Sequence, residues 1–150
     1  MRDLHQVHAL FLKTGQMHDP LAAAEILKFC SLSSQRDLQY ARKVFRHMRE
    51  PNCFSWNTLI RALSESDEKD DPFEAFLLFF QMLCSGIVLP NKFTFPSVLK
   101  ACATTGQLLE GEQVHALAVK FGFEKDEFVA SNLVRIFSCV LLCPMSFTPT

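Results

Sequence analysis

Four basic side chains recur at long, nearly regular intervals along this chain of 150 residues. Lys28, Arg61, Lys100 and Arg135 are separated by 33, 39 and 35 residues. Intervals of this size are typical of stacked supersecondary units. If equivalent positions of such units form a row, the four cations can contact successive phosphates of a nucleic-acid strand. The alternative is that they are solvated charges on an outer edge of the protein.

An apolar residue stands seven positions before each of these cations. These residues, which we call the openers, are Leu21, Phe54, Phe93 and Phe128. An aromatic ring can stack on any base and so provides affinity without sequence choice. The alternative interpretation is a hydrophobic staple, in which the residue packs onto the helix that it precedes. The sequence leaves both interpretations open.

Helices with a common pattern must position the two rows. Segments with matching apolar pairs begin at the four openers, and a second helical pattern follows the first three of them, at residues 40–48, 74–82 and 111–118. Ala41, Ala75 and Gly111 lie where two helix backbones would approach closely. Residues 5–15 (HQVHALFLKTG) also match residues 112–122 (EQVHALAVKFG). The 3.6-residue period predicts an all-α fold, an α-solenoid of stacked antiparallel helix hairpins (a TPR-like superhelix).

Polar residues and glycines predict where these helices begin and end. Ser55 and Thr94 are expected as N-caps. Asp71 is expected to cap the next helix, with Pro72 in its first turn and Glu74 as the reciprocal partner. The acidic run from Glu65 to Asp71 is interpreted as an enlarged, solvated turn. Glycines that should lie just past helix ends are Gly15, Gly86, Gly106 and Gly122.

The pattern divides the chain into whole and partial units. The divisions are 1–19, 20–52, 53–91, 92–126 and 127–150. In the last of these, the helix is expected to reach about Ser138, because Pro144 and Pro149 prevent a regular helix in the divergent tail. Since the chain opens and closes within units, we interpret it as a fragment of a longer protein.

Several classes of function are not indicated. The chain has a formal net charge of −1 and no CxxC pair, and Cys139 and Cys143 lack further ligands nearby for a metal. No glycine-rich phosphate loop, nucleophile elbow or zinc-deaminase signature occurs, and His8 and His115 are expected to be packed side chains. We therefore predict no enzymatic activity, cofactor or small-molecule substrate. Residues 75–90 are too short to span a membrane, and no transit peptide is visible.

Three stretches together resemble pentatricopeptide repeat proteins. They read FSWNTLIRAL, EAFLLFFQMLCSG and PNKFTFPSVLKACATTGQLLEGEQVHALAVKFGFEKDEFVASNLV. The likeness is to the plant subgroup in which long, short and standard repeats alternate, and it extends to about Ser138. It implies that 1–19 is the C-terminal helix of a partial repeat, 20–52 a long repeat, 53–91 a short repeat with an enlarged turn, 92–126 a standard repeat and 127–150 a truncated one. It further implies sequence-specific binding of single-stranded RNA in mitochondria or chloroplasts, in RNA editing or processing.

The resemblance also assigns base-reading roles to the fifth and last positions of each unit. The fifth positions are Ala24, Asn57, Pro96 and Ser131, and the last positions are Asn52, Asn91 and Asp126. The family associates the combination of Asn57 with Asn91 with pyrimidines, and an amide offers both a donor and an acceptor. Ala24 and Pro96 have no side-chain hydrogen bond to offer, and Ser131 lacks its partner. The implied partners are single-stranded RNA with pyrimidines and RNA-editing or processing factors.

Two other interpretations remain open. A tetratricopeptide-like scaffold for protein–protein interaction has similar helix pairs, although its W-x2-L-G signature is absent and polar residues at unit junctions favour RNA. A product that does not fold alone is the third interpretation, because the C-terminal pattern is broken.

Overall fold

Consecutive helices make up nearly all of the computed structural model, which describes residues 2–15, 19–33 and 36–142. The helices are α1 (Arg2–Thr14), α2 (Pro20–Leu32), α3 (Leu38–His47), α4 (Cys53–Ser64), α5 (Asp71–Ser85), α6 (Thr94–Thr105), α7 (Leu108–Lys120) and α8 (Glu127–Leu142). No strand occurs in these three described ranges. The predicted all-α fold is therefore confirmed.

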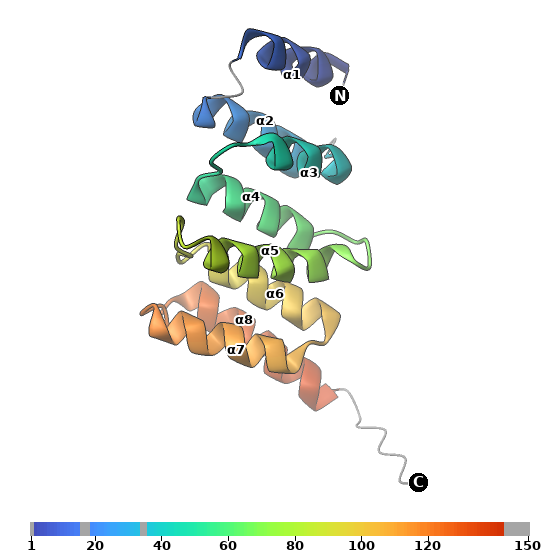
Figure 1. Cartoon of the computed structure of the whole chain (residues 1–150). Coiled ribbons are helices and arrows are strands. Elements are labelled where there is room, and N and C mark those ends of the chain that lie inside the picture. The colour runs from blue at the N-terminus through green and yellow to red at the C-terminus, as the bar shows by residue number, and fades with distance from the viewer. Residues whose placement is uncertain (1, 16–18, 34–35, 143–150) are drawn as a thin grey trace.

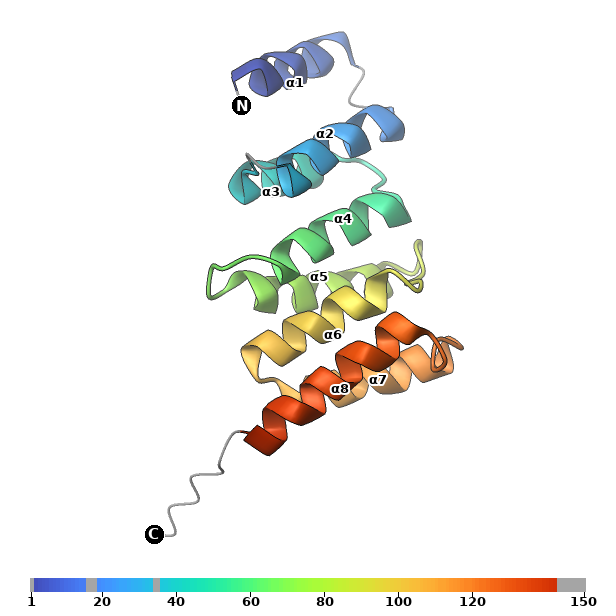
Figure 2. The same cartoon turned by 180° about the vertical axis from the view of Figure 1, so that it is seen from behind.

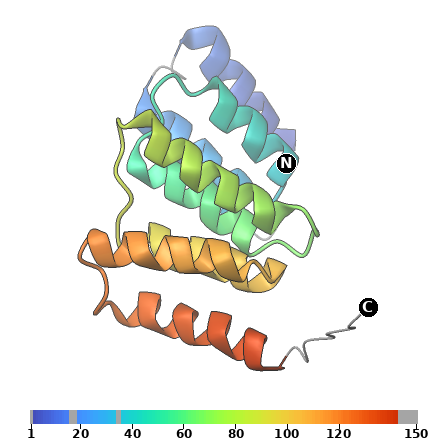
Figure 3. The ribbon, with the colours of Figure 1, turned by 60° about the horizontal axis from the view of Figure 1, so that its bottom comes forward.

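The helices stack in two layers, with α1 and α8 at opposite ends (Figure 1). One layer is formed by α2, α4, α6 and α8, and each of these helices contacts the next (Figure 2). The other contains α3, α5 and α7, so each hairpin contributes one helix to each layer. At the far end, α7 and α8 lie side by side and are joined by a short turn (Figure 3). This open stack of antiparallel hairpins is the predicted α-solenoid.

A single hydrophobic core runs between the two layers from α2 to α8. Phe79 on α5 and Phe95 on α6 are fully buried, with ring centroids 5.8 Å apart. Ala41 and Ala75 are also fully buried, as expected for positions of close helix approach. A Cβ atom at Gly111 would lie 3.0 Å from a side-chain carbon of Ile136. The three small residues thus lie at tightly packed contacts between helices.

Acidic and amide side chains cap four of the described helices. Asn52 Oδ1 accepts a hydrogen bond of 2.9 Å from the backbone N–H of Ser55, so Asn52 caps α4 and Ser55 lies inside its first turn. The prediction that Ser55 and Thr94 are N-caps was wrong, since Thr94 is the first residue of α6. Asn is at least as good a cap as Ser, and Asn52 precedes the helix on extended backbone. The same kind of cap occurs at Asp19, Asp37 and Asp126.

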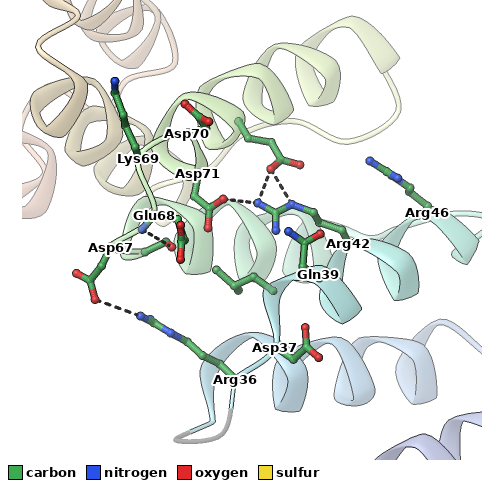
Figure 4. Close-up of a pocket in the computed structure, with 13 residues that line it drawn as sticks. Arg36, Asp37, Gln39, Arg42, Arg46, Asp67, Glu68, Lys69, Asp70 and Asp71 are labelled. Atoms are coloured by element: carbon green, nitrogen blue, oxygen red, sulfur yellow. Dashed lines mark hydrogen bonds and ion pairs between the residues drawn. The ribbon is translucent and has the colours of Figure 1, made fainter.

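An ion pair changes the predicted start of α5. The helix begins at Asp71, and its N-cap Asp70 makes no side-chain capping bond. The Asp71 carboxylate instead accepts from the guanidinium of Arg42 on α3, at 2.5 Å, and Arg42 also contacts Glu74 at 2.6 Å (Figure 4). Hydrogen bonding to Glu74 and Asp71 raises the pKa of Arg42 against the opposing effect of burial. The prediction that Asp71 is an N-cap was therefore wrong, because this carboxylate neutralises a cation from a neighbouring hairpin.

The helix ends agree with the glycine positions. Gly86 and Gly106 end α5 and α6 in the left-handed conformation, with φ of 63° and 70°. A residue with a Cβ atom adopts this conformation only with strain, which explains the glycines there. The last helix α8 continues to Leu142, beyond the predicted end at Ser138. The divergent tail from Cys143 onward lies outside the described residues.

Candidate nucleic-acid interface

A groove of about 660 Å³ crosses the layer formed by α4, α6 and α8. Its lining combines aromatic, amide and charged side chains: Leu32, Phe54, Asn57, Thr58, Arg61, Glu65, Lys92, Phe93, Pro96, Ser97, Lys100 and Phe128. Seven of these residues were candidates from sequence, namely Phe54, Asn57, Arg61, Phe93, Pro96, Lys100 and Phe128. Residues from three successive units therefore meet in one groove, as equivalent positions of a solenoid should.

The openers present their side chains to solvent. Leu21 is 72% exposed, Phe54 47%, Phe93 64% and Phe128 69%. Phe54 and Phe128 lie inside the first turn of their helices, whereas a staple residue precedes the N-cap and packs inward. These positions do not fit a hydrophobic staple. Exposed rings in one groove instead offer a surface on which planar groups can stack.

Two amides predicted to act together lie in contact. Asn57 Nδ2 donates to Asn91 Oδ1 at 3.1 Å, across the junction between α4 and α6. The Thr94 hydroxyl donates to Asn57 Oδ1 at 2.6 Å, and Asn91 Nδ2 approaches the Cys53 sulfur at 3.1 Å. Burial raises the pKa of the Cys53 thiol, so it stays protonated at neutral pH. The sequence analysis did not place Thr94 or Cys53 in this cluster. The spacing of three residues between Asn91 and Thr94 was a usable signal for Thr94, because side chains at that spacing contact nearby backbone groups.

The neighbouring junctions lack such a pair. Ala24 is 3% exposed and belongs to the core, and the Asn52 oxygen is occupied by the backbone N–H and the hydroxyl of Ser55. Pro96 lines the groove but has no polar side-chain atom, and the Asp126 carboxylate caps α8. Ser131 is outside the groove lining, with its hydroxyl bonded to the backbone of Phe128 at 3.0 Å. Among the predicted fifth and last positions, only Asn57 and Asn91 form a hydrogen-bonded pair in the described structure.

The predicted row of cations is partly neutralised. Arg61 and Lys100 both contact the Glu65 carboxylate, at 3.2 and 3.8 Å. Lys28 pairs with Glu25 at 3.4 Å, and the exposed Arg135 is not part of the groove lining. The sequence predicts Glu65 in a solvated turn, and its partly exposed side chain pairs with both cations there. Its position four residues after Arg61 on the same helix face was the available signal.

A second hollow of about 1080 Å³ lies between α3 and the start of α5, with the turn 65–70 along one side (Figure 4). It is lined by Arg36, Asp37, Leu38, Gln39, Arg42, Arg46, Ser66, Asp67, Glu68, Lys69, Asp70, Asp71 and Glu74. These are six carboxylates against four cations, with no aromatic ring. Because its lining carries net negative charge, this hollow is unsuited to a polyanion.

Two further kinds of feature are absent from the residues that the structure describes. No helix in these ranges is long and apolar enough to cross a membrane. No group of three or more potential metal ligands occurs in the same part of the chain.

The fold and groove define a class of protein, a helical-hairpin solenoid with a polar and aromatic groove along one layer. A family model for the PPR repeat matches residues 54–87. The chain is 60% identical over 139 residues to a pentatricopeptide repeat-containing protein of Arabidopsis thaliana. The matched region covers 91% of this chain and 21% of that protein. The chain belongs to the pentatricopeptide repeat family.

Two further relatives from Arabidopsis thaliana carry the same family name. One, named as chloroplastic, is 39% identical over 138 residues, covering 91% of this chain and 24% of the relative. The other, named as chloroplastic and mitochondrial, is 40% identical over 141 residues, covering 93% of this chain and 22% of the relative. The chain thus spans about a fifth to a quarter of the length of the curated relatives that it matches.

Proposed function

We propose that this chain binds single-stranded RNA in the groove formed by α4, α6 and α8. The observation that carries the proposal is the meeting of exposed rings, the Asn57 amide and cations from successive units in one groove. Stacking on aromatic faces combined with backbone electrostatics is the usual physics of single-strand binding. A duplex keeps its bases stacked inside and cannot use the rings.

Each part of the groove has a distinct proposed role. Phe54 and Phe93 take bases between or against their rings, and Arg61 and Lys100 contact phosphates. Asn57 and Asn91 read one pyrimidine through their amides. Since Ala24 is buried and Pro96 has no polar side-chain atom, this segment reads at most one base with a full pair. The remaining contacts then contribute affinity with little sequence choice.

These roles depend on how the chain divides into repeats. We propose that 20–52, 53–91 and 92–126 are the whole repeats, of long, short and standard type in that order. Two relatives carry organellar names. We propose that the protein to which this segment belongs acts on transcripts in a chloroplast or mitochondrion, in RNA editing or processing.

Fluorescence anisotropy with labelled oligonucleotides tests the proposal. The chain should bind single-stranded oligouridine more tightly than oligoadenosine, and both more tightly than duplex RNA of the same length. Affinity should fall as salt rises, because binding releases counterions. Equal affinity for duplex and single strands, or no binding at low salt by a chain with a helical circular dichroism spectrum, would contradict it.

A further inference from the structure

We propose that the outer face of α5 is a docking surface for an amphipathic helix of a partner protein, one that carries basic residues at one end. The helix α5 lies between α3 and α7, in the layer opposite the groove, and no described element covers its outer side (Figure 1). This surface is separate from the groove, so it does not need RNA in order to act.

A second apolar stripe runs along α5 on the side away from the core. The core face of this helix includes Ala75, Phe79 and Met82, which are fully buried. The other stripe, which we call the outer stripe, consists of Phe73, Leu77, Phe80 and Cys84. Phe73 is 42% exposed and Leu77 is 45% exposed. Cys84 is exposed as well, and Phe80 is partly buried.

The spacing of the outer stripe is that of a surface on which another helix packs. Its members follow one another at intervals of four, three and four residues. At about 100° per residue, they lie within about 60° of one another around the helix axis and span about 17 Å along it. Apolar residues at alternating intervals of three and four are the pattern by which one helix packs along another. A helix that is apolar on two opposite sides is typical of one with packing partners on both.

The neighbouring helices of the same layer lack such a stripe. Because Ala41, Ala75 and Gly111 occupy equivalent positions, residues of α3 and α7 can be matched to those of α5. The first three members of the outer stripe correspond in α3 to Gln39, Lys43 and Arg46, and in α7 to Leu109, Gln113 and Ala116. All six are exposed. The stack therefore accepts polar side chains at these positions, and the outer stripe is not needed to build it.

The width of the outer stripe fits a single helix. Its apolar side chains form one line, and the matching positions of α3 carry the cations Lys43 and Arg46. A broad partner face would also cover these charges and remove their water, which costs free energy. A lone helix laid along α5 contacts the apolar line and leaves the cations solvated. Recognition of one helix through anchors at three- and four-residue spacing is a common binding mode.

The turn at the start of α5 indicates the charge of the partner. It is exposed and carries three carboxylates against one cation: Asp67, Glu68, Asp70 and Lys69. A second copy of this chain does not complement it. The last turn of α5 contains no basic residue, so an antiparallel copy of α5 brings no cation to the turn, and a parallel copy brings a second acidic turn. A partner helix with basic residues at the matching end supplies the cations, and their attraction sets its direction along the outer stripe.

The first test uses a designed helical peptide labelled with fluorescein. It has about 18 residues, enough to span the outer stripe, with leucines at alternating three- and four-residue intervals and lysines at one end. A counterpart has glutamates in place of the lysines. In anisotropy titrations, the chain should bind the lysine peptide about three- to tenfold more tightly than the glutamate peptide. Equal affinity for the two peptides, or no binding of either, overturns the proposal.

The second test changes the outer stripe itself. The double variant Phe73→Gln with Leu77→Lys gives α5 the residues that α3 exposes at the equivalent positions. Its affinity for the lysine peptide should fall at least about tenfold, because two exposed apolar contacts are lost. The matched control is Leu109→Gln, which changes an exposed leucine on α7 and should leave the affinity unchanged.

Circular dichroism melting verifies that the double variant is folded. If it is not, Leu77→Lys alone replaces it, with an expected loss of about three- to fivefold. Unchanged affinity in the folded variant, or an equal loss in Leu109→Gln, overturns the proposal.

Two further measurements locate the contact and exclude self-pairing. The lysine peptide should slow the alkylation of Cys84 by iodoacetamide several-fold, as followed by mass spectrometry of digested protein, because Cys84 lies within the outer stripe. An unchanged rate overturns the location. In sedimentation velocity, the wild type should form no dimer through this surface. A concentration-dependent dimer that the folded double variant abolishes would make a second copy the occupant and overturn the partner helix.

Discussion

The two hollows of this molecule contain similar numbers of side chains but have opposite character. In the hollow between α3 and α5, the deeply placed Arg42 is matched by Asp71 and Glu74. In the groove of α4, α6 and α8, the rings of Phe54 and Phe93 are 47% and 64% exposed. The ion pairs of Arg42 in the larger hollow therefore stabilise the fold, whereas the smaller groove exposes apolar rings to solvent.

The difference shows how a repeat protein separates stability from recognition. Its two layers repeat along the chain, yet the short and nearly buried ion pairs of Arg42 lie on the layer of α3 and α5. Groups with spare hydrogen-bonding or stacking capacity lie on the layer of α4 and α6. Size alone would favour the hollow between α3 and α5, because volume does not distinguish nearly buried ion pairs from exposed rings.

The largest effect should come from removing the ion pairs of Arg42 in the hollow between α3 and α5. Arg42→Met leaves Asp71, with a side chain only 10% exposed, without its cationic partner. We expect a loss of about 2–4 kcal/mol in the free energy of unfolding, measured by urea titration. The control is Arg36→Met, whose partner Asp67 is 3.9 Å away and fully exposed, and which should not change the urea midpoint. Equal midpoints for the two variants would contradict the structural role of Arg42.

The next effect concerns the amide pair. Asn57→Ala should reduce the preference for oligouridine over oligoadenosine by about 1–2 kcal/mol, because it removes the group that accepts from the base. The matched control is Ser131→Ala, since Ser131 occupies the equivalent position but bonds its own helix. Anisotropy titrations of both variants provide the comparison. If Ser131→Ala loses as much preference as Asn57→Ala, the reading role of the Asn57–Asn91 junction is wrong.

A smaller effect is expected at the cations of the groove. The double variant Arg61→Gln with Lys100→Gln should reduce the slope of log affinity against log salt by about 1.4, from about 0.7 for each phosphate contact. Lys28→Gln is the control, because Lys28 lies outside the groove lining and pairs with Glu25. An unchanged slope in the double variant would remove these two cations from the mechanism.

The smallest effect is a gain. Glu65 contacts both Arg61 and Lys100 and so competes with a phosphate for them. Glu65→Gln should tighten RNA binding by about twofold to fivefold at low salt, since an exposed pair is worth at most about 1 kcal/mol. Glu68→Gln, on the acidic turn but outside the groove lining, should have less effect. Weaker binding by Glu65→Gln would show that Glu65 orients the cations instead of competing for them.

The sequence was enough to predict the solenoid, because the helical period of apolar residues and the small residues at helix contacts recur in successive units. The family resemblance pairs Asn57 with Asn91, and the two amides are in hydrogen-bond contact. The sequence did not predict the roles of Thr94, Glu65 and Asp71, since each depends on a partner from another helix or hairpin. Arg42 lies 29 residues before Asp71, and nothing local distinguishes an aspartate that caps a helix from one that pairs with such a cation.

Photo-cross-linking of the chain to single-stranded RNA containing 4-thiouridine compares the two hollows directly. Peptides are identified by mass spectrometry after digestion, with oligoadenosine as unlabelled competitor. The cross-links should lie in residues 53–61 and 92–100, which contain Phe54, Asn57 and Phe93 of the groove. Cross-links concentrated in α3 and the start of α5, with none on α4 or α6, would contradict the assignment of the groove as the RNA site.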